Sequence, residues 1–357
     1  MNKAEIPTPA LLVDLDILDA NIAKMACHLK EAGKAFRPHA KTHKTPEIAR
    51  ACLAAGAVGT CTAKLSEAET LADAGLCGLL ITTAMIGDWR IARAIQLAAR
   101  RPDTIFSADD SANLDDLNTA AKSAGLQLNI AIDLLVGART GVEPGSAAVA
   151  LAQQIDRASN LRLSGIQAFA GPCAHTEGFA ARKKVTEECM GRAVETRRLI
   201  EACGIACNWL SGGSTGTYNI DSQIDGITEV QPGSFLFMDV DYARIHTDFG
   251  FSLTVLSTVF SKSTKSTAII DAGFKAFSTD RPFGPQLKGA EAAYSWAGDE
   301  HGRLDLTTAT RSIELGDRLE FYVPHCDPTV NLYNEIYATR GDQVEAIWKI
   351  TARGLSQ

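Results

Sequence analysis

The chain has 357 residues, of which 46% are hydrophobic and 22% are charged, as in an ordinary globular protein. Its 35 lysines and arginines are outnumbered by 42 aspartates and glutamates, and this net charge of −7, without a basic patch, argues against nucleic-acid binding. No apolar run approaches the roughly 18 residues of a membrane span, and the N-terminus has no apolar signal core, so no membrane partner is expected. Nine scattered cysteines without a C-x-x-C pair favour reduced thiols in a cytoplasmic protein.

The first two thirds of the chain alternate between β-prone and helical segments. A strand is expected at 10–15, and a helix follows from Asp16, with Ile22, Met25 and Leu29 at helical spacing. Short apolar runs predict eight further strands, at 35–40, 58–63, 79–83, 104–107, 126–134, 161–169, 207–210 and 226–230. Helical segments separate them, at 45–55, 65–74, 92–99, 112–124, 147–158 and 182–203. This alternation predicts an α/β domain at 16–240, a (β/α)₈ barrel of the TIM type.

The pattern changes after Asp241, where helical periodicity fades and turn residues become frequent. Strands are expected at 251–259, 266–271, 304–307, 318–322, 332–337 and 343–351. We therefore expect a second, all-β domain at 241–357, because a chain of this length usually exceeds one core. The strand at 10–15 precedes the barrel and could pair with this domain, which would then include residues 1–15.

The sequence RPHAKTHK at 37–44 places Lys41 where the first barrel strand gives way to a loop. The carboxyl ends of barrel strands form the rim where catalytic groups gather. A partly desolvated lysine has a lowered pKa, so its amine can form a Schiff base with an aldehyde. We interpret Lys41 as the catalytic lysine that binds pyridoxal 5′-phosphate, although an isolated lysine is often only a surface charge.

Two loops after late barrel strands are candidates for binding the phosphate of that cofactor. The first contains Gly212, Gly213, Ser214, Thr215 and Gly216, and the second contains Gln231, Gly233 and Ser234. Glycines let backbone amides approach a ligand closely, while serine and threonine add hydroxyl donors. Either stretch alone is weak, because many loops are rich in glycine and serine, but late barrel loops often bind phosphate.

Two other side chains follow barrel strands and could join the chemistry. Arg139 lies just beyond the strand at 126–134 and could hydrogen-bond the phenolic oxygen of the cofactor, with a surface ion pair as the alternative. His175 follows the strand at 161–169 and could carry a proton or orient a metal-bound water, with a solvent-facing loop histidine as the alternative.

The triplet His325-Cys326-Asp327 is a candidate metal site. On one side of an extended segment, the imidazole and the carboxylate two residues apart would form a chelating pair, with Cys326 pointing away. This pair suits a divalent metal, Mn²⁺ or else Zn²⁺, Co²⁺ or Mg²⁺, and leaves positions open for water and substrate. Asp299 could add a carboxylate through water. The alternative is a loop histidine beside a capping aspartate, since H-x-D is common by chance.

These motifs together resemble the D-threonine aldolase and D-serine dehydratase family. These are fold-type III pyridoxal phosphate enzymes related to the barrel of alanine racemase. The similar stretches lie along nearly the whole chain, at 8–15, 37–41, 64–68, 212–216, 237–239, 271–273, 299–302 and 325–329. The resemblance implies a dimer, with Lys41 as the Schiff-base lysine and Arg139 as the phenolate partner. It also implies His325 and Asp327 as metal ligands and Asp299 acting through water.

The same resemblance bears on the reaction. Gln231 falls where racemases have an arginine at the ring nitrogen, which implies neutral hydrogen bonding there. Aldolases of the family are similar to this chain in having H-x-D at the metal, whereas dehydratases have H-x-C. The resemblance therefore implies an aldolase that cleaves D-3-hydroxy-amino acids to glycine and an aldehyde, like D-threonine or 3-hydroxy-D-aspartate aldolases. The chain departs from the usual pattern at Ser214, where a third glycine is common, and at Phe169, near where aldolases often have a tyrosine.

Three other functions stay open from the sequence. A dehydratase on the same scaffold would release a keto acid and ammonia from a D-serine-type substrate. A racemase would leave His325 and Asp327 without a role. A non-catalytic pyridoxal phosphate carrier would have a barrel lysine but no β-rich domain.

Overall fold

The computed structural model describes residues 1–137 and 139–357; Ala138 lies outside the described residues. The chain forms two compact units. The barrel unit comprises Lys24–Lys41, Pro46–Gly233 and Leu355–Gln357, and the β-rich unit comprises Met1–Ala23, Thr42–Thr45 and Ser234–Gly354. The predicted domain boundaries, 16–240 and 241–357 with 1–15, cut the chain at somewhat different positions and remain a prediction.

Eight parallel strands form the centre of the barrel unit, in the order β2-β9-β8-β7-β6-β5-β4-β3. They are β2 (Ala35–Phe36), β3 (Thr60–Thr62), β4 (Leu79–Ile81), β5 (Ile105–Ala108), β6 (Leu128–Asp133), β7 (Leu161–Ala168), β8 (Leu210–Gly212) and β9 (Glu229–Val230). A parallel bridge between His39, shortly after β2, and Cys61 of β3 connects the two ends of the sheet, so the sheet closes. Every residue of β6 is buried, as expected for a strand covered on both faces.

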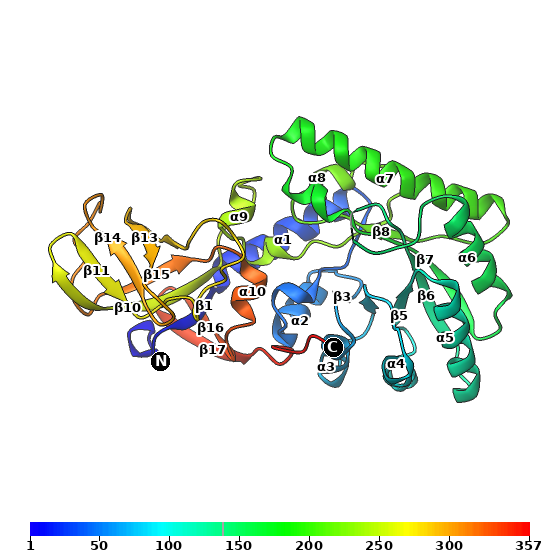
Figure 1. Cartoon of the computed structure of the whole chain (residues 1–357), viewed down its shortest axis with the longest axis horizontal. Coiled ribbons are helices and arrows are strands. Elements are labelled where there is room, and N and C mark those ends of the chain that lie inside the picture. Colours follow the sequence, from blue (N-terminus) through cyan, green and yellow to red (C-terminus); the bar gives the residue numbers. More distant parts are fainter. Residues whose placement is uncertain (138) are drawn as a thin grey trace. The chain divides into compact units, whose positions relative to one another are not determined.

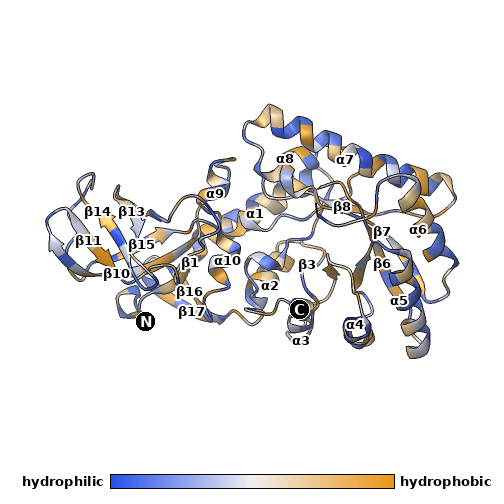
Figure 2. Cartoon of the chain, viewed as in Figure 1, coloured by the Kyte–Doolittle hydropathy of each residue, from blue (hydrophilic) through white to orange (hydrophobic). Residues whose placement is uncertain are grey.

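Helices lie on the outer side of these strands (Figure 1). They are α2 (Pro46–Ala54), α3 (Leu65–Asp73), α4 (Asp88–Arg100), α5 (Ser111–Ala124), α6 (Ser146–Arg157), α7 (Phe179–Ala202) and α8 (Tyr218–Asp221), while α1 (Leu15–Glu31) precedes the barrel. In α4 the buried residues Ile91, Ala94, Leu97 and Ala98 recur at helical spacing and form one apolar face. Blue and orange segments accordingly alternate along the helices, most clearly in α7 (Figure 2). Within the described residues, no helix is both long and apolar enough to span a membrane.

The β-rich unit is built on a second, mostly antiparallel sheet. Its strands are β1 (Ala10–Asp14), β10 (Leu253–Thr264), β11 (Thr267–Ile270), β12 (Gln286–Leu287), β13 (Ala293–Trp296), β14 (Gly302–Asp305), β15 (Arg318–Tyr322), β16 (Glu335–Arg340) and β17 (Gln343–Lys349). Strand β1 pairs with β10 and β16, so the early strand does join this unit. Two short helices complete it, α9 (Val240–Ala243) and α10 (Cys326–Val330). The predicted fold class, a (β/α)₈ barrel followed by a β domain, is confirmed.

Two local predictions were wrong. The strand expected at 35–40 ends at Phe36, and the chain enters a short 3₁₀ helix, η2 (Ala40–Thr42), which contains Lys41. The segment after β15 is not extended throughout, because α10 begins at Cys326 directly after His325. Lys41 and the His325–Asp327 pair are therefore presented by helical turns.

Candidate active site

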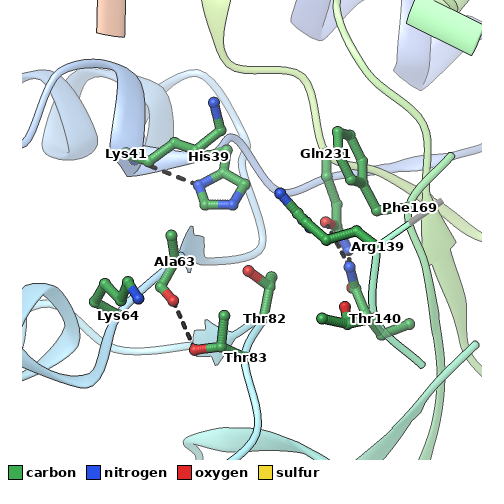
Figure 3. A pocket seen from close by; sticks show the side chains of 11 residues that line it. His39, Lys41, Ala63, Lys64, Thr82, Thr83, Arg139, Thr140, Phe169 and Gln231 are labelled. Atoms are coloured by element: carbon green, nitrogen blue, oxygen red, sulfur yellow. Dashed lines mark hydrogen bonds between the residues drawn. The ribbon is translucent and has the colours of Figure 1, made fainter. Parts of the chain in front are cut away.

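A cavity of about 230 Å³ lies in the barrel unit, where the strands end (Figure 3). Its walls are formed by His39, Lys41, Ala63, Lys64, Thr82, Thr83, Arg139, Thr140, Gln167, Phe169 and Gln231. Ala63 directly follows β3, Phe169 directly follows β7 and Gln231 directly follows β9. The cavity therefore occupies the carboxyl-terminal rim of the barrel, where catalytic groups were expected.

The structure brings together three of the predicted cofactor ligands, because Lys41, Arg139 and Gln231 all line this cavity. The backbone N–H of Lys41 donates to His39 Nδ1 at 3.3 Å, which fixes the turn that carries the lysine. The guanidinium of Arg139 lies 5.4 Å from the centre of the Phe169 ring, within cation–π range. The Phe169 ring therefore supports the arginine.

The charge of the cavity wall suits an anionic ligand. Lys41, Lys64 and Arg139 supply cations, and no carboxylate side chain lines the cavity among the described residues. A phosphate ester that also carries an aldehyde fits this donor set, since one amine can bind the aldehyde while the other cations offset the negative charge of the ligand. The residues present therefore fit pyridoxal phosphate.

The glycine loop at 212–216 continues from β8 beside Gln231, whose backbone N–H donates to the Gly212 carbonyl at 2.8 Å. Gly213 has a φ of +73°, in the left-handed region, and a side chain there would lie 2.5 Å from a carboxylate oxygen of Asp221. Ser214 and Thr215 are buried, and the Ser214 and Thr217 hydroxyls lie 2.9 Å apart. Gly233 ends the barrel unit, while Ser234 begins a 3₁₀ helix of the β-rich unit, so their predicted phosphate contacts stay predictions.

Asp221 is a buried carboxylate directly beside this loop, and sequence reasoning missed it. Neither of its side-chain oxygens has a hydrogen-bond partner among the residues that the structure describes. Burial raises the pKa of Asp221 to about 7, against the lowering influence of nearby Thr217 and Ser214. Burial also raises the pKa of Asp133, at the end of β6, to about 6.

Replacing Asp221 by asparagine is expected to flatten the pH dependence of stability. The folded protein keeps the Asp221 proton between about pH 4 and 7, whereas the unfolded chain releases it, so the free energy of unfolding falls as pH rises through this window. Across this window the difference in the free energy of unfolding between the wild type and the variant should change by a few kcal/mol, because one pKa unit corresponds to about 1.4 kcal/mol. Urea unfolding at pH 5 and pH 8 measures it, with the exposed Asp116→Asn as the control. If the free energy of unfolding changed equally between pH 5 and pH 8 in the wild type and in Asp221→Asn, Asp221 would not be the group that keeps its proton in the folded protein.

The predicted metal ligands lie in the β-rich unit, at the start of α10. His325 Nε2 and Asp327 Oδ2 face each other at 4.0 Å, and both side chains are largely buried. His325 Nδ1 lies 2.7 Å from Asp280 Oδ2, so the carboxylate accepts the Nδ1 proton and leaves the Nε2 lone pair for a metal. This arrangement fits a divalent cation, and Asp280 was not predicted from the sequence.

The metal centre gains no third protein ligand from the structure. Among the described residues there is no group of three or more histidine, cysteine or acidic side chains that could hold a metal ion. Cys326 is buried, and its thiol donates to Asp327 Oδ2 at 3.3 Å. Asp299 is exposed between β13 and β14, and its predicted role through water stays a prediction. Asp239 accepts the Cys326 N–H at 2.8 Å and so holds the first turn of α10.

Two further histidines, His175 and His43, are not among the described residues that line the cavity. His175 is exposed at the end of a 3₁₀ helix, Gly171–His175, and its role in proton transfer stays a prediction. His43 is fully buried, accepts the Thr45 N–H at Nδ1, and has no partner for Nε2 within the described part of the chain. Burial lowers the pKa of His43 to about 4, although the charge of Asp327 raises it, so this imidazole is neutral at pH 7. No sequence motif singled out His43 as a functional residue.

Comparison with known proteins identifies the fold and the family. The family described as alanine racemase, N-terminal domain, matches residues 13–241, and a serine dehydratase domain matches residues 252–339. The chain is 36% identical to the D-threonine aldolase of an Arthrobacter species over 361 residues, covering 99% of this chain and 94% of that protein. It is 34% identical to the 3-hydroxy-D-aspartate aldolase of Paracoccus denitrificans (strain Pd 1222) over 366 residues, with the same coverage.

A solved structure supports the same relationship over the whole chain. The crystal structure of D-threonine aldolase from Filomicrobium marinum superposes with a TM-score of 0.94 at 33% identity, covering 99% of this chain and 98% of that one. The matches extend over both the barrel and the β-rich region, so they go beyond a shared barrel. The chain therefore belongs to the D-threonine aldolase and D-serine dehydratase family, whose barrel is that of alanine racemase.

Proposed function

We propose that this protein is a pyridoxal phosphate-dependent aldolase, a carbon–carbon lyase that cleaves D-3-hydroxy-amino acids to glycine and an aldehyde. The observation that carries the proposal is the meeting of Lys41, Arg139 and Gln231 in one cation-lined cavity at the barrel rim. Aldolases that act on D-threonine and on 3-hydroxy-D-aspartate are similar to this chain over nearly its full length.

Each residue of the cavity has a distinct task in this proposal. The Lys41 amine would hold the cofactor through its aldehyde. Arg139 neutralises the phenolic oxygen, and Gln231 hydrogen-bonds the ring nitrogen. The amides and hydroxyls of the loop at 212–216, together with Gly233 and Ser234, hold the phosphate. When bound, the cofactor ring withdraws the electron pair of the breaking Cα–Cβ bond.

We propose that His325 and Asp327 hold a divalent metal, Mn²⁺ or else Zn²⁺, Co²⁺ or Mg²⁺. A metal there supplies positive charge beside the β-hydroxyl of the substrate, which favours loss of its proton. His175 is the proposed acceptor of that proton, and Asp299 is proposed to act through water. The support is the hydrogen bond from His325 Nδ1 to Asp280, which leaves Nε2 available as a ligand.

A product assay separates the aldolase from a dehydratase on the same scaffold. D-threonine, D-phenylserine and 3-hydroxy-D-aspartate are incubated separately with the cofactor-loaded protein and Mn²⁺. Glycine plus an aldehyde is the expected outcome, because Asp327 supplies a carboxylate where dehydratases of the family have a thiol. A keto acid plus ammonia would instead establish the dehydratase, and the substrate that reacts fastest identifies the preferred side chain.

We also propose a homodimer that works in the cytoplasm. The nine cysteines, all within the described residues, are free thiols, as in a reducing compartment. Sedimentation equilibrium at micromolar concentration tests the dimer, and a mass of one chain would refute it.

A further inference from the structure

We propose that a buried relay from Arg37 to Gln231 fixes the Gln231 side-chain amide so that its carbonyl oxygen faces the cofactor. In this orientation the Gln231 carbonyl oxygen presents a hydrogen-bond acceptor to the cavity. It keeps the pyridine nitrogen of pyridoxal phosphate protonated without an acidic partner. The inference rests on the proposed function and deepens it, because it assigns a state to the bound cofactor and a positioning role to Ser211.

The relay begins at a buried ion pair in the barrel. Arg37 Nε donates to Glu229 Oε1 at 2.9 Å, and the two side chains are 9% and 1% exposed. Burial alone would lower the pKa of Arg37, but the charge of Glu229 raises it overall, so the guanidinium is charged. A carboxylate held by this cation has no proton to give, and it acts only as an acceptor.

The hydroxyl of Ser211, in β8, comes next. Its Oγ lies 2.5 Å from the same Glu229 Oε1. Because Glu229 can only accept, the single hydroxyl proton of Ser211 points to the carboxylate. Ser211 Oγ can therefore only accept from any other neighbour. Ser211 is fully buried, so water does not compete for this bond.

Gln231 is the neighbour that donates to Ser211, at 2.6 Å. Only the amide nitrogen of Gln231 can donate, so the relay determines which end of this amide faces Ser211, a choice that coordinates alone leave open. The second N–H of Gln231 is donated to Gln167 Oε1 at 2.5 Å. Both amide protons are thus committed, whereas the oxygen receives a longer contact of 3.4 Å from Gln167 Nε2 and keeps a lone pair.

The position of this acceptor determines which cofactor atom meets it. Gln231 and Lys41 lie on opposite sides of the cavity in Figure 3. In pyridoxal phosphate the ring nitrogen is para to the carbon that carries the aldehyde, so a ring held by Lys41 directs its nitrogen toward Gln231. A nitrogen that meets an acceptor is favourable only when it carries a proton. The neutral carbonyl oxygen of Gln231 therefore accepts the hydrogen bond of the protonated ring nitrogen, for which a carboxylate would otherwise be needed.

Nitrogen-15 NMR of the holoenzyme, reconstituted with pyridoxal phosphate labelled at the ring nitrogen, tests the proposal, because this chemical shift separates protonated from unprotonated pyridine. The wild type should give the protonated shift. Ser211→Ala should move it toward the unprotonated value, since the amide of Gln231 can then turn over. Ser107→Ala is the matched control, because Ser107 is an equally buried barrel serine whose hydroxyl has no partner among the described residues. Its shift should equal that of the wild type.

Gln231→Met, which keeps the length of the side chain but removes the amide, should shift the signal in the same direction as Ser211→Ala. This second variant tests the relay even if Ser211→Ala does not fold. An unprotonated nitrogen in the wild type would overturn the inference, as would unchanged shifts in both variants. Neither result would contradict the proposed aldolase reaction or the linkage of the cofactor to Lys41. A protein that binds no cofactor would instead overturn the proposed function, and the inference with it.

Discussion

Replacing Lys41 by alanine is expected to abolish covalent attachment of pyridoxal phosphate and to lower turnover by about 10³-fold or more. Lys41 lines the same cavity as Arg139 and Gln231, which follow β6 and β9. Without its amine the cofactor aldehyde has no anchor, and non-covalent contacts alone position it poorly. Borohydride reduction of the wild type, followed by tryptic mass spectrometry, should find the cofactor on Lys41.

Lys64 provides a matched control, because it lines the same cavity two residues after β3. A Lys64→Ala variant should still carry the reduced cofactor on Lys41, whereas Lys41→Ala should carry none. Cofactor found on Lys64 in the wild type would show that the wrong lysine had been assigned. Labelling of neither lysine, with full activity retained, would refute pyridoxal phosphate chemistry altogether.

The barrel could be predicted from the sequence because strands buried on both faces leave short, continuous apolar runs. All eight predicted positions contain a strand or overlap one, although β8 begins at Leu210, where the predicted run at 207–210 ends. The error at β2 has a different cause. An apolar pattern detects burial, and Phe36 and Ala40 are both buried, but Ala40 belongs to the 3₁₀ turn that contains Lys41.

The β-rich unit was harder to predict because pairing between distant segments defines several of its elements. Strand β12 has two residues and exists through its pairing with β15, and β13 alternates between exposed and half-buried positions. Neither leaves a strong local pattern. Helix α10 was missed because Pro328 argues against a helix, yet Pro328 is its third residue, where a backbone N–H has no helical acceptor.

The residues of the candidate site also fall into two groups, those that a local sequence pattern predicts and those that only the folded chain brings together. Lys41, Arg139 and Gln231 could be found because each follows a predicted strand, and the barrel brings strand ends together. Gln167 could not be found, since it lies inside β7 and reaches Gln231 only through the arrangement of the strands. Asp280 lies far from His325 in the sequence, within a loop that no local signal marks as functional. Its function depends on a contact that only the folded chain creates.

Replacing Asp327 by alanine is expected to remove the metal dependence of the reaction. The variant leaves His325 as a single ligand, so Mn²⁺ affinity should fall by on the order of 10²-fold or more, and turnover should drop to the level of chelator-treated wild type. Asp280→Ala should have a smaller effect, about 10- to 100-fold on affinity, because it removes only the carboxylate that orients His325. Titration of Mn²⁺ followed by electron paramagnetic resonance measures both. The exposed Asp305→Ala, in β14, serves as the control.

The proposed function requires the metal to act on the molecule that Lys41 binds, and bound Mn²⁺ can report this directly. Because Mn²⁺ is paramagnetic, it should broaden the phosphorus resonance of the bound cofactor in the wild type, whereas the same amount of Mn²⁺ should have little effect in Asp327→Ala. Equal broadening in both proteins would mean that the metal binds elsewhere. Turnover that survives complete chelation, together with Mn²⁺ binding unchanged by Asp327→Ala, would remove the metal from the reaction and leave His325 and Asp327 as structural residues of α10.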